Sequence, residues 1–298
     1  AALRLGLAFG LGMFGAGVNW VYISIHYFGH SPLPAAIGVM LLLVAYMSVF
    51  PALLAYIGAH SRAQGTVWVL MLLPAGWVLT EWLRSWLFTG FPWLNLGYTQ
   101  IDSPLAGYAP LLGVYGLGGL TALSAGLLAW TFITPGRARL IGPLLFALLW
   151  AGGAALKTQE WTQTDGAPIR VSLVQGNIPQ DEKWDPDQQV VTLEKYLELT
   201  RGEWTSQDRW HPDLVIWPES AIPRYVERDP QYRRTIEQVA SAAAAWIVVG
   251  SIGFAEDGES YFNSVFVFAP GGRVPWRYDK VHLVPFGEYV PLAGQLSF

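Results

Sequence analysis

The first half of the chain is a series of apolar runs separated by short stretches of Gly, Pro, Ser or Arg. This pattern constrains the fold more than any other feature. The runs cover roughly residues 5–28, 35–58, 66–88, 106–133 and 139–156. A helix needs about 20 such residues to cross a bilayer. One run alone could be a buried helix of a soluble core, but five in series with so few charges predict a membrane domain.

Charged residues divide the chain near residue 156. Residues 1–156 hold five arginines and only two acids, Glu81 and Asp102, and the other charges follow. The net charge of −4 is therefore the sum of about +3 and about −7. We expect a transmembrane helical domain at 1–156, with about five spans, and a mildly acidic, water-exposed domain at 157–298.

The arginines also predict an orientation, because short loops rich in Lys and Arg stay in the cytoplasm. Arg4, Arg62 and the pair Arg137 and Arg139 fall on one side if five spans are counted. The amino terminus is then cytoplasmic, and residues 157–298 emerge on the periplasmic side.

The chain begins at Ala1 without an initiator methionine and ends at Phe298 without a closing element. We expect a fragment, cut within the membrane region at one end and within the second domain at the other. Its lack of cysteine then says little about redox compartment.

The second half alternates strand and helix patterns, which predicts an α/β layered domain. Strands are expected near 169–174, 214–217 and 246–252, helices at 192–201 and 231–245, and a hairpin at 261–269 and 273–279. Polar residues follow two of these strands. Because sites in α/β sheets form at strand ends, Glu219 and Lys280 are expected to converge.

Glu219 ends the motif Val215–Ala221, in which Pro218 stops the strand. A carboxylate there is a candidate general base if burial beside an apolar wall such as Trp217 raises its pKa. The alternatives are a solvated carboxylate or a residue at a helix amino terminus.

Lys280 is a candidate cation for stabilising an oxyanion, and Glu288 would complete a Glu-Lys-Glu cluster. The alternative for Lys280 is a surface lysine paired with Asp279, and the alternative for Glu288 is an ordinary charged loop residue. His282 has no second His or Cys at ligand spacing and receives no role.

Trp184 lies in a charged loop. Three roles are open for such an aromatic residue: covering a ligand, contacting a membrane surface, or packing beneath its own loop. Glu81 and Arg84 are three residues apart in the third run. They pair on one helix face or lie near the membrane interface.

Several segments resemble bacterial apolipoprotein N-acyltransferases, membrane enzymes with a nitrilase (carbon-nitrogen hydrolase) type domain. The similar segments are 89–93 (TGFPW), 174–180 (VQGNIPQ), 183–185 (KWD), 216–223 (IWPESAIP) and 282–288 (HLVPFGE). They occur in the family's order through nearly the whole chain.

The resemblance implies a nitrilase-like α-β-β-α sandwich, incomplete at its carboxyl end, with a Glu-Lys-Cys triad. Glu219 matches the base and Lys280 the lysine, while Glu288 matches a supporting carboxylate and Trp184 a mobile-loop tryptophan. The triad cysteine belongs to a later motif, so the chain alone is expected to be inactive.

The implied reaction moves the sn-1 acyl chain of a phospholipid such as phosphatidylethanolamine through a Cys thioester. The acceptor is the α-amino group of an S-diacylglyceryl-cysteine at the start of a lipoprotein. The enzyme would lie in the bacterial inner membrane with its site on the periplasmic side. No cofactor, metal or nucleic acid is expected.

Two other functions stay open on the residues alone. A membrane-tethered nitrilase-like amidase would use the same groups without lipid entry. A transporter with a periplasmic binding domain would carry paired charges and broken helices in its spans.

Overall fold

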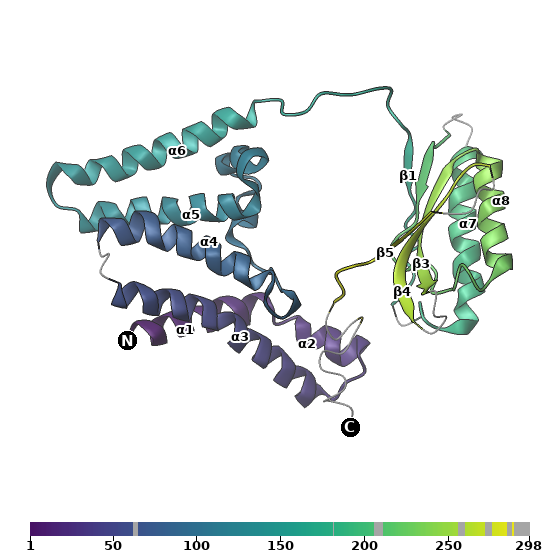
Figure 1. The fold of residues 1–298 in the computed structure, drawn as a ribbon, viewed down its shortest axis with the longest axis horizontal. Coiled ribbons are helices and arrows are strands. Elements are labelled where there is room, and N and C mark those ends of the chain that lie inside the picture. Colours follow the sequence, from purple (N-terminus) through teal and green to yellow (C-terminus); the bar gives the residue numbers. More distant parts are fainter. Residues whose placement is uncertain are drawn as a thin grey trace. The chain divides into compact units, whose positions relative to one another are not determined.

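The chain forms two compact units, Ala1–Thr164 and Asp165–Phe298, in a computed structural model (Figure 1). The structure describes residues 1–61, 65–180, 182–205, 211–255, 260–271, 276–284 and 288. The domain boundary at residue 156 and the membrane orientation stay predictions, and Arg62 lies outside the described residues.

The regular elements described in the first unit are all helices. Its longer helices are α1 (Ala2–Gly17), α3 (Leu33–His60), α4 (Leu73–Arg84), α5 (Ala109–Ile133) and α6 (Ile141–Lys157). Shorter elements join them: α2 (Val21–Ile23), η1 (Ser24–Phe28), η2 (Trp68–Leu72), η3 (Leu87–Thr89), η4 (Leu96–Gln100), η5 (Pro104–Tyr108) and η6 (Gly136–Leu140).

Three helical stretches of the described chain are long and apolar enough to cross a membrane: Leu33–His60, Pro104–Ile133 and Gly136–Leu156. Ala2–Gly17 and Val21–Phe28 make a fourth span if this pair, bent by 53°, is counted as one. The third predicted run is helical from Trp68 to Arg84 but is shorter and carries two charges. A helical membrane region is thus confirmed, while the number of five spans stays a prediction.

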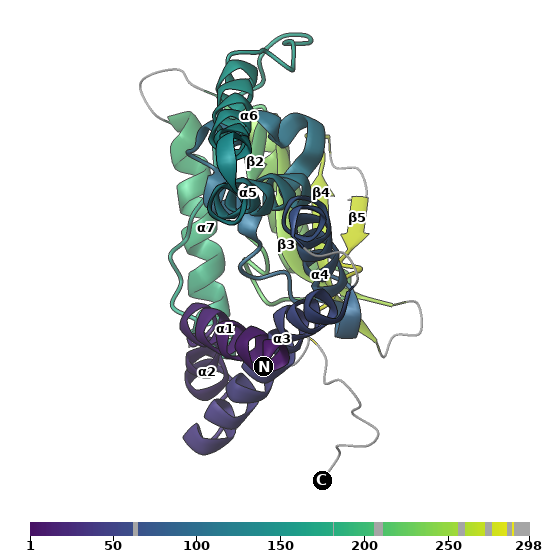
Figure 2. The same cartoon turned by 90° about the vertical axis from the view of Figure 1, so that its left-hand side faces the viewer.

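Small residues let α1 and α3 approach closely, and the two helices lie together in both views (Figures 1 and 2). A Cβ added to Gly6 would lie 2.6 Å from the carbonyl oxygen of Pro51, and one added to Gly10 would lie 2.7 Å from the Cα of Ser48. Two glycines four residues apart therefore form the contact face, as in small-xxx-small helix pairs of membranes.

The second unit contains one five-stranded sheet in the order β1-β2-β3-β4-β5. The strands are β1 (Val171–Leu173), β2 (Leu214–Ile216), β3 (Trp246–Phe254), β4 (Tyr261–Phe268) and β5 (Trp276–Asp279). The first three run parallel, and β4 is antiparallel to both β3 and β5. The carboxyl ends of β2, β3 and β5 therefore share one edge of the sheet.

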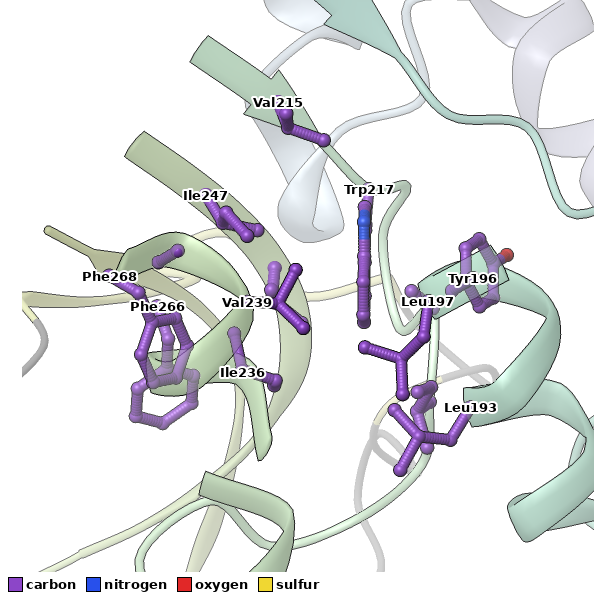
Figure 3. Packing of buried hydrophobic residues seen from close by; sticks show 14 of the residues in the cluster. Leu193, Tyr196, Leu197, Val215, Trp217, Ile236, Val239, Ile247, Phe266 and Phe268 are labelled. Atoms are coloured by element: carbon purple, nitrogen blue, oxygen red, sulfur yellow. The ribbon is translucent and has the colours of Figure 1, made fainter. Parts of the chain in front are cut away.

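Helices α7 (Gln189–Thr205) and α8 (Pro230–Ala243) lie side by side on one face of this sheet (Figure 1). The core forms between them and the strands. In Figure 3, Leu193 and Leu197 of α7 lie beside Trp217, and Ile236 and Val239 of α8 face the strand residues Ile247, Phe266 and Phe268. Successive side chains of a strand point to opposite faces of the sheet, so only every second residue of β4 enters this core.

The other face of the sheet is apolar and open within the described part of this unit. Trp246 and Trp276 stack there with ring centroids 5.4 Å apart, and Leu173 and Tyr278 are exposed. The described residues thus form one sheet and one helical layer. A nitrilase-like α/β domain is present, and the α-β-β-α sandwich stays a prediction.

Candidate active site

Glu219 stands in a short arch that leaves β2 and crosses β3. The N–H of Trp217 donates to the carbonyl of Val248 (2.9 Å), and the N–H of Ala221 donates to the carbonyl of Gly250 (2.9 Å). Glu219 lies between these two anchors. The next residue, Ser220, has a φ of +45°, a conformation that costs a non-glycine residue about 1–2 kcal/mol.

Gly250 of β3 lies directly beneath this arch and lets its backbone approach closely. A Cβ at Gly250 would lie 2.4 Å from the carbonyl oxygen of Pro218 and 2.7 Å from the Cα of Glu219. Both neighbours are backbone atoms and cannot rotate away, so the site requires glycine beneath Glu219.

Trp217 anchors the arch from the opposite side. Its ring is 2% exposed, stacks on Tyr196 at 5.1 Å and donates from Nε1 to Oγ1 of Thr200 (2.9 Å). The ring therefore packs against α7. The expectation that it buries the Glu219 carboxylate is not met in the described part, where that side chain is 65% exposed.

Lys280 follows β5 and joins two carboxylates. Its N–H extends the ladder by donating to the carbonyl of Asn263 (2.8 Å). Its Nζ lies 3.2 Å from Oε1 of Glu219 and 2.9 Å from Oε1 of Glu288. Partial burial opposes its charge, but hydrogen bonds to Glu288 and Glu219 outweigh this and raise the pKa of Lys280.

Glu288 is held at both ends of its carboxylate. Its Oε2 accepts from the N–H of Val284 (2.7 Å), while Oε1 receives Lys280. Partial burial favours its neutral form, but bonds from Asn263, Lys280 and Val284 together lower the pKa of Glu288. The structure thus brings Glu219 and Lys280 together, as their places at strand ends indicated, and adds Glu288 as the expected cluster required. The alternative in which Lys280 pairs only with Asp279 is wrong.

Asn263 on β4 is a site residue that the sequence reasoning missed. Its Nδ2 donates to Oε1 of Glu219 (2.5 Å) and to Oε1 of Glu288 (2.8 Å). One amide group therefore bridges the two carboxylates that Lys280 also bridges. A signal was available, because asparagine is disfavoured in strands, and Asn263 with Ser264 interrupts the apolar run at 261–268.

The loop that carries Trp184 is tied to the same place. Nζ of the preceding Lys183 donates to the backbone carbonyl of Glu219 (3.2 Å). Burial lowers the pKa of Lys183, against the opposing charge of Glu219. Trp184 itself is 54% exposed, so it does not pack beneath its own loop. Its role at the site stays a prediction.

The arrangement suits acyl transfer. A carboxylate that could accept a proton lies beside an ammonium that could stabilise an oxyanion, and a second carboxylate contacts that ammonium. Among the described residues, no group of three His, Asp or Glu side chains is placed to hold a metal. The chain itself supplies no cysteine.

Two family models match the chain, one in each unit. Residues 1–127 match the apolipoprotein N-acyltransferase N-terminal domain, and residues 170–297 match carbon-nitrogen hydrolase. Curated proteins named apolipoprotein N-acyltransferase match over nearly the whole chain. The relative from Methylococcus capsulatus is 40% identical over 300 residues, which is 100% of this chain and 58% of the relative.

The chain belongs to the apolipoprotein N-acyltransferase family. The member from Nitrosomonas europaea is 42% identical and that from Vibrio vulnificus 39%; the matches cover 98% and 97% of this chain and 57% of each relative. The family resemblance expected from the sequence is therefore confirmed. The chain spans somewhat more than half the length of these family members.

Proposed function

We propose that the protein is an apolipoprotein N-acyltransferase of the inner membrane, with Glu219, Lys280 and Glu288 in its periplasmic active site. The observation that carries this is the 3.2 Å contact between Oε1 of Glu219 and Nζ of Lys280, in a chain of this family. The apolar helices of the first unit favour a substrate that is a membrane lipid. The arginine pattern favours an orientation with the active site on the periplasmic side.

In the first half-reaction, Glu219 takes the proton of the cysteine thiol that the family supplies in a later motif. The thiolate attacks the sn-1 ester carbonyl of a phospholipid, and Lys280 stabilises the resulting oxyanion. When the ester C–O bond breaks, Glu219 returns the proton to the leaving alkoxide. A thioester and a lysophospholipid result.

In the second half-reaction, the α-amino group of an S-diacylglyceryl-cysteine attacks the thioester. Glu219 accepts a proton from the amine and returns it to the leaving thiolate, so an amide forms and the enzyme is restored. Glu288 and Asn263 hold the side chains of Lys280 and Glu219 in position during both steps. Two easier transfers thus replace one difficult transfer.

Glu219→Gln tests the role of the base in a protein that carries this chain together with the cysteine segment. The readout is hydroxylamine-sensitive labelling by a phosphatidylethanolamine with a fluorescent sn-1 chain. We expect labelling of the parent protein and none of Glu219→Gln or Lys280→Ala, while Glu198→Gln and Lys195→Ala on the exposed side of α7 label normally. Parent-like labelling of Glu219→Gln would show that another group takes the proton.

A further inference from the structure

A buried pair of charges ends helix α4 in the first unit. Glu81 is fully buried and Arg84 is 2% exposed, and Oε1 of Glu81 lies 3.9 Å from Nη2 of Arg84. Charges are costly within a membrane domain and persist where partners hold them. The proposed acyl transfer gives this pair no role.

Glu81 fixes the chain that follows α4. Its Oε1 accepts from the backbone N–H of Leu96 (2.6 Å) and from Nε1 of Trp77 (2.9 Å). Its other oxygen faces Gly118 of α5, where a Cβ would lie 2.7 Å away. The carboxylate therefore joins α4 and α5 to the segment between them.

Arg84 holds the same segment by its guanidinium and its backbone. It donates from Nη1 to the carbonyl of Trp93 (3.0 Å) and from Nη2 to Oδ1 of Asn95 (3.2 Å). Its own carbonyl accepts from the N–H of Phe91 (2.8 Å). The close partners of both charges thus lie mainly in residues 91–96, at shorter distances than the pair itself.

The segment that follows α4 has a strained backbone and therefore requires stabilising contacts. Phe88, Thr89 and Leu94 have φ values of +53°, +71° and +60°. Each such conformation costs a non-glycine residue about 1–2 kcal/mol, and such strain persists only where surrounding contacts enforce it. The buried pair supplies such contacts on both sides of Leu94, at Trp93, Asn95 and Leu96.

The strained connection exposes aromatic and aliphatic side chains and has no charge from Ser85 to Ile101. The exposed side chains include Trp86 (66%), Phe88 (84%), Trp93, Tyr98 and Ile101. We call residues 85–101 the aromatic connection. Trp and Tyr are enriched where a bilayer meets water, since their rings are apolar and their N–H or O–H groups are polar.

The length of the preceding helix places this connection at a membrane boundary. Helical geometry runs from Trp68 to Arg84 through η2 and α4, which at about 1.5 Å per residue spans about 25 Å. That approaches the roughly 30 Å of hydrocarbon in a bilayer. A helix of this length that begins at one surface brings the aromatic connection close to the other.

We propose that the aromatic connection lies in the head-group layer of the phospholipid bilayer, and that Glu81 and Arg84 are the positioning residues that hold it there. The partner is a lipid surface. The proposal does not depend on acyl transfer, because it concerns a different unit and different residues.

Spin labelling tests this directly, since the chain has no cysteine and an introduced one is labelled uniquely. Phe88→Cys carries a nitroxide in vesicles of phosphatidylethanolamine and phosphatidylglycerol, and its collisions with oxygen and with a water-soluble nickel chelate are measured. The controls are Leu144→Cys, exposed on α6, and Glu198→Cys, exposed on α7. We expect an oxygen-to-nickel ratio severalfold above that of Glu198→Cys and below that of Leu144→Cys.

A ratio equal to that of Glu198→Cys, or low collision with both reagents as at a protein-covered site, overturns the proposal. The positioning role is tested in the same labelled chain by Glu81→Gln with Arg84→Met, and by the milder Asn95→Ala should the double variant fail to fold. The label at residue 88 should gain mobility severalfold while one at Leu144 is unchanged. An unchanged spectrum at residue 88 refutes the positioning role.

Discussion

Gly250→Ala should damage the active site through a single methyl group that touches no catalytic atom. The added Cβ would lie 2.4 Å from the carbonyl oxygen of Pro218, whereas ordinary contacts begin at 3.4 Å. The arch must therefore move by about 1 Å, and such a displacement costs on the order of 100-fold in rate. That factor corresponds to about 2.7 kcal/mol of activation free energy.

The assay is the rate of phospholipid-dependent acylation, with thermal unfolding measured in parallel. Overpacking should also lower stability by about 1–3 kcal/mol, so rates are compared well below the melting temperature. Gly202→Ala is the matched control, because nothing lies within 4 Å of its added Cβ. It should leave the rate unchanged.

A second readout does not depend on acyl transfer. Moving Glu219 away should lower the pKa of Lys280, which its bonds to Glu288 and Glu219 now raise. This pKa is measurable by NMR of ¹³C-dimethylated lysine. If Gly250→Ala folds and keeps both the parent rate and the parent Lys280 pKa, the view of Gly250 as the seat of Glu219 is wrong.

Three further changes probe the site and its support. Asn263→Ala removes one hydrogen bond from each carboxylate, so acylation should slow about tenfold or more and the pKa of Glu288 should rise; an unchanged pH–rate profile would contradict this. The lowered pKa of Glu288 means that its stabilising contribution is complete above pH 4.5 and is lost as pH falls through its folded pKa. Glu288→Gln should therefore flatten the acid side of a plot of melting temperature against pH, and an equally steep acid side would count against it. Trp217→Phe leaves the buried hydroxyl of Thr200 without its donor, which should cost about 1–3 kcal/mol of unfolding free energy and lower the melting temperature; an unaltered melting curve would exclude that bond as a support.

The elements of the second unit could be predicted because local patterns encode them. The expected strand at 246–252 is the core of β3, and the expected helix at 231–245 closely matches α8 (Pro230–Ala243). The convergence of Glu219 with Lys280 followed from a rule about strand ends. The two residues converge only because β4 is antiparallel to both β3 and β5, so that β5 runs in the same direction as β2.

What escaped prediction depends on contacts between distant residues. Asn263 meets Glu219 across 44 positions of sequence, and no local pattern reports such a pair. The seat at Gly250 is similar, because a glycine in a strand indicates close backbone approach without naming the partner. The motif around Trp217 correctly predicted a strand. Because side chains of a strand alternate between its two faces, the Trp217 ring lies on the face covered by helices, whereas Glu219 lies beyond the strand end.

The buried pair of α4 also bears on how the protein enters its membrane. On insertion scales an arginine costs about 2.5–3.5 kcal/mol at the centre of a spanning helix and less towards its ends. Arg84 is the last residue of α4, but it is buried and therefore still needs polar partners. Arg84 and Glu81 find their close partners in residues 91–96, which leave the ribosome after the helix. We therefore expect stable insertion of α4 to require synthesis of the chain through Leu96, and then of α5, whose Gly118 lies against Glu81. Helix α4, its connection and α5 are expected to insert together.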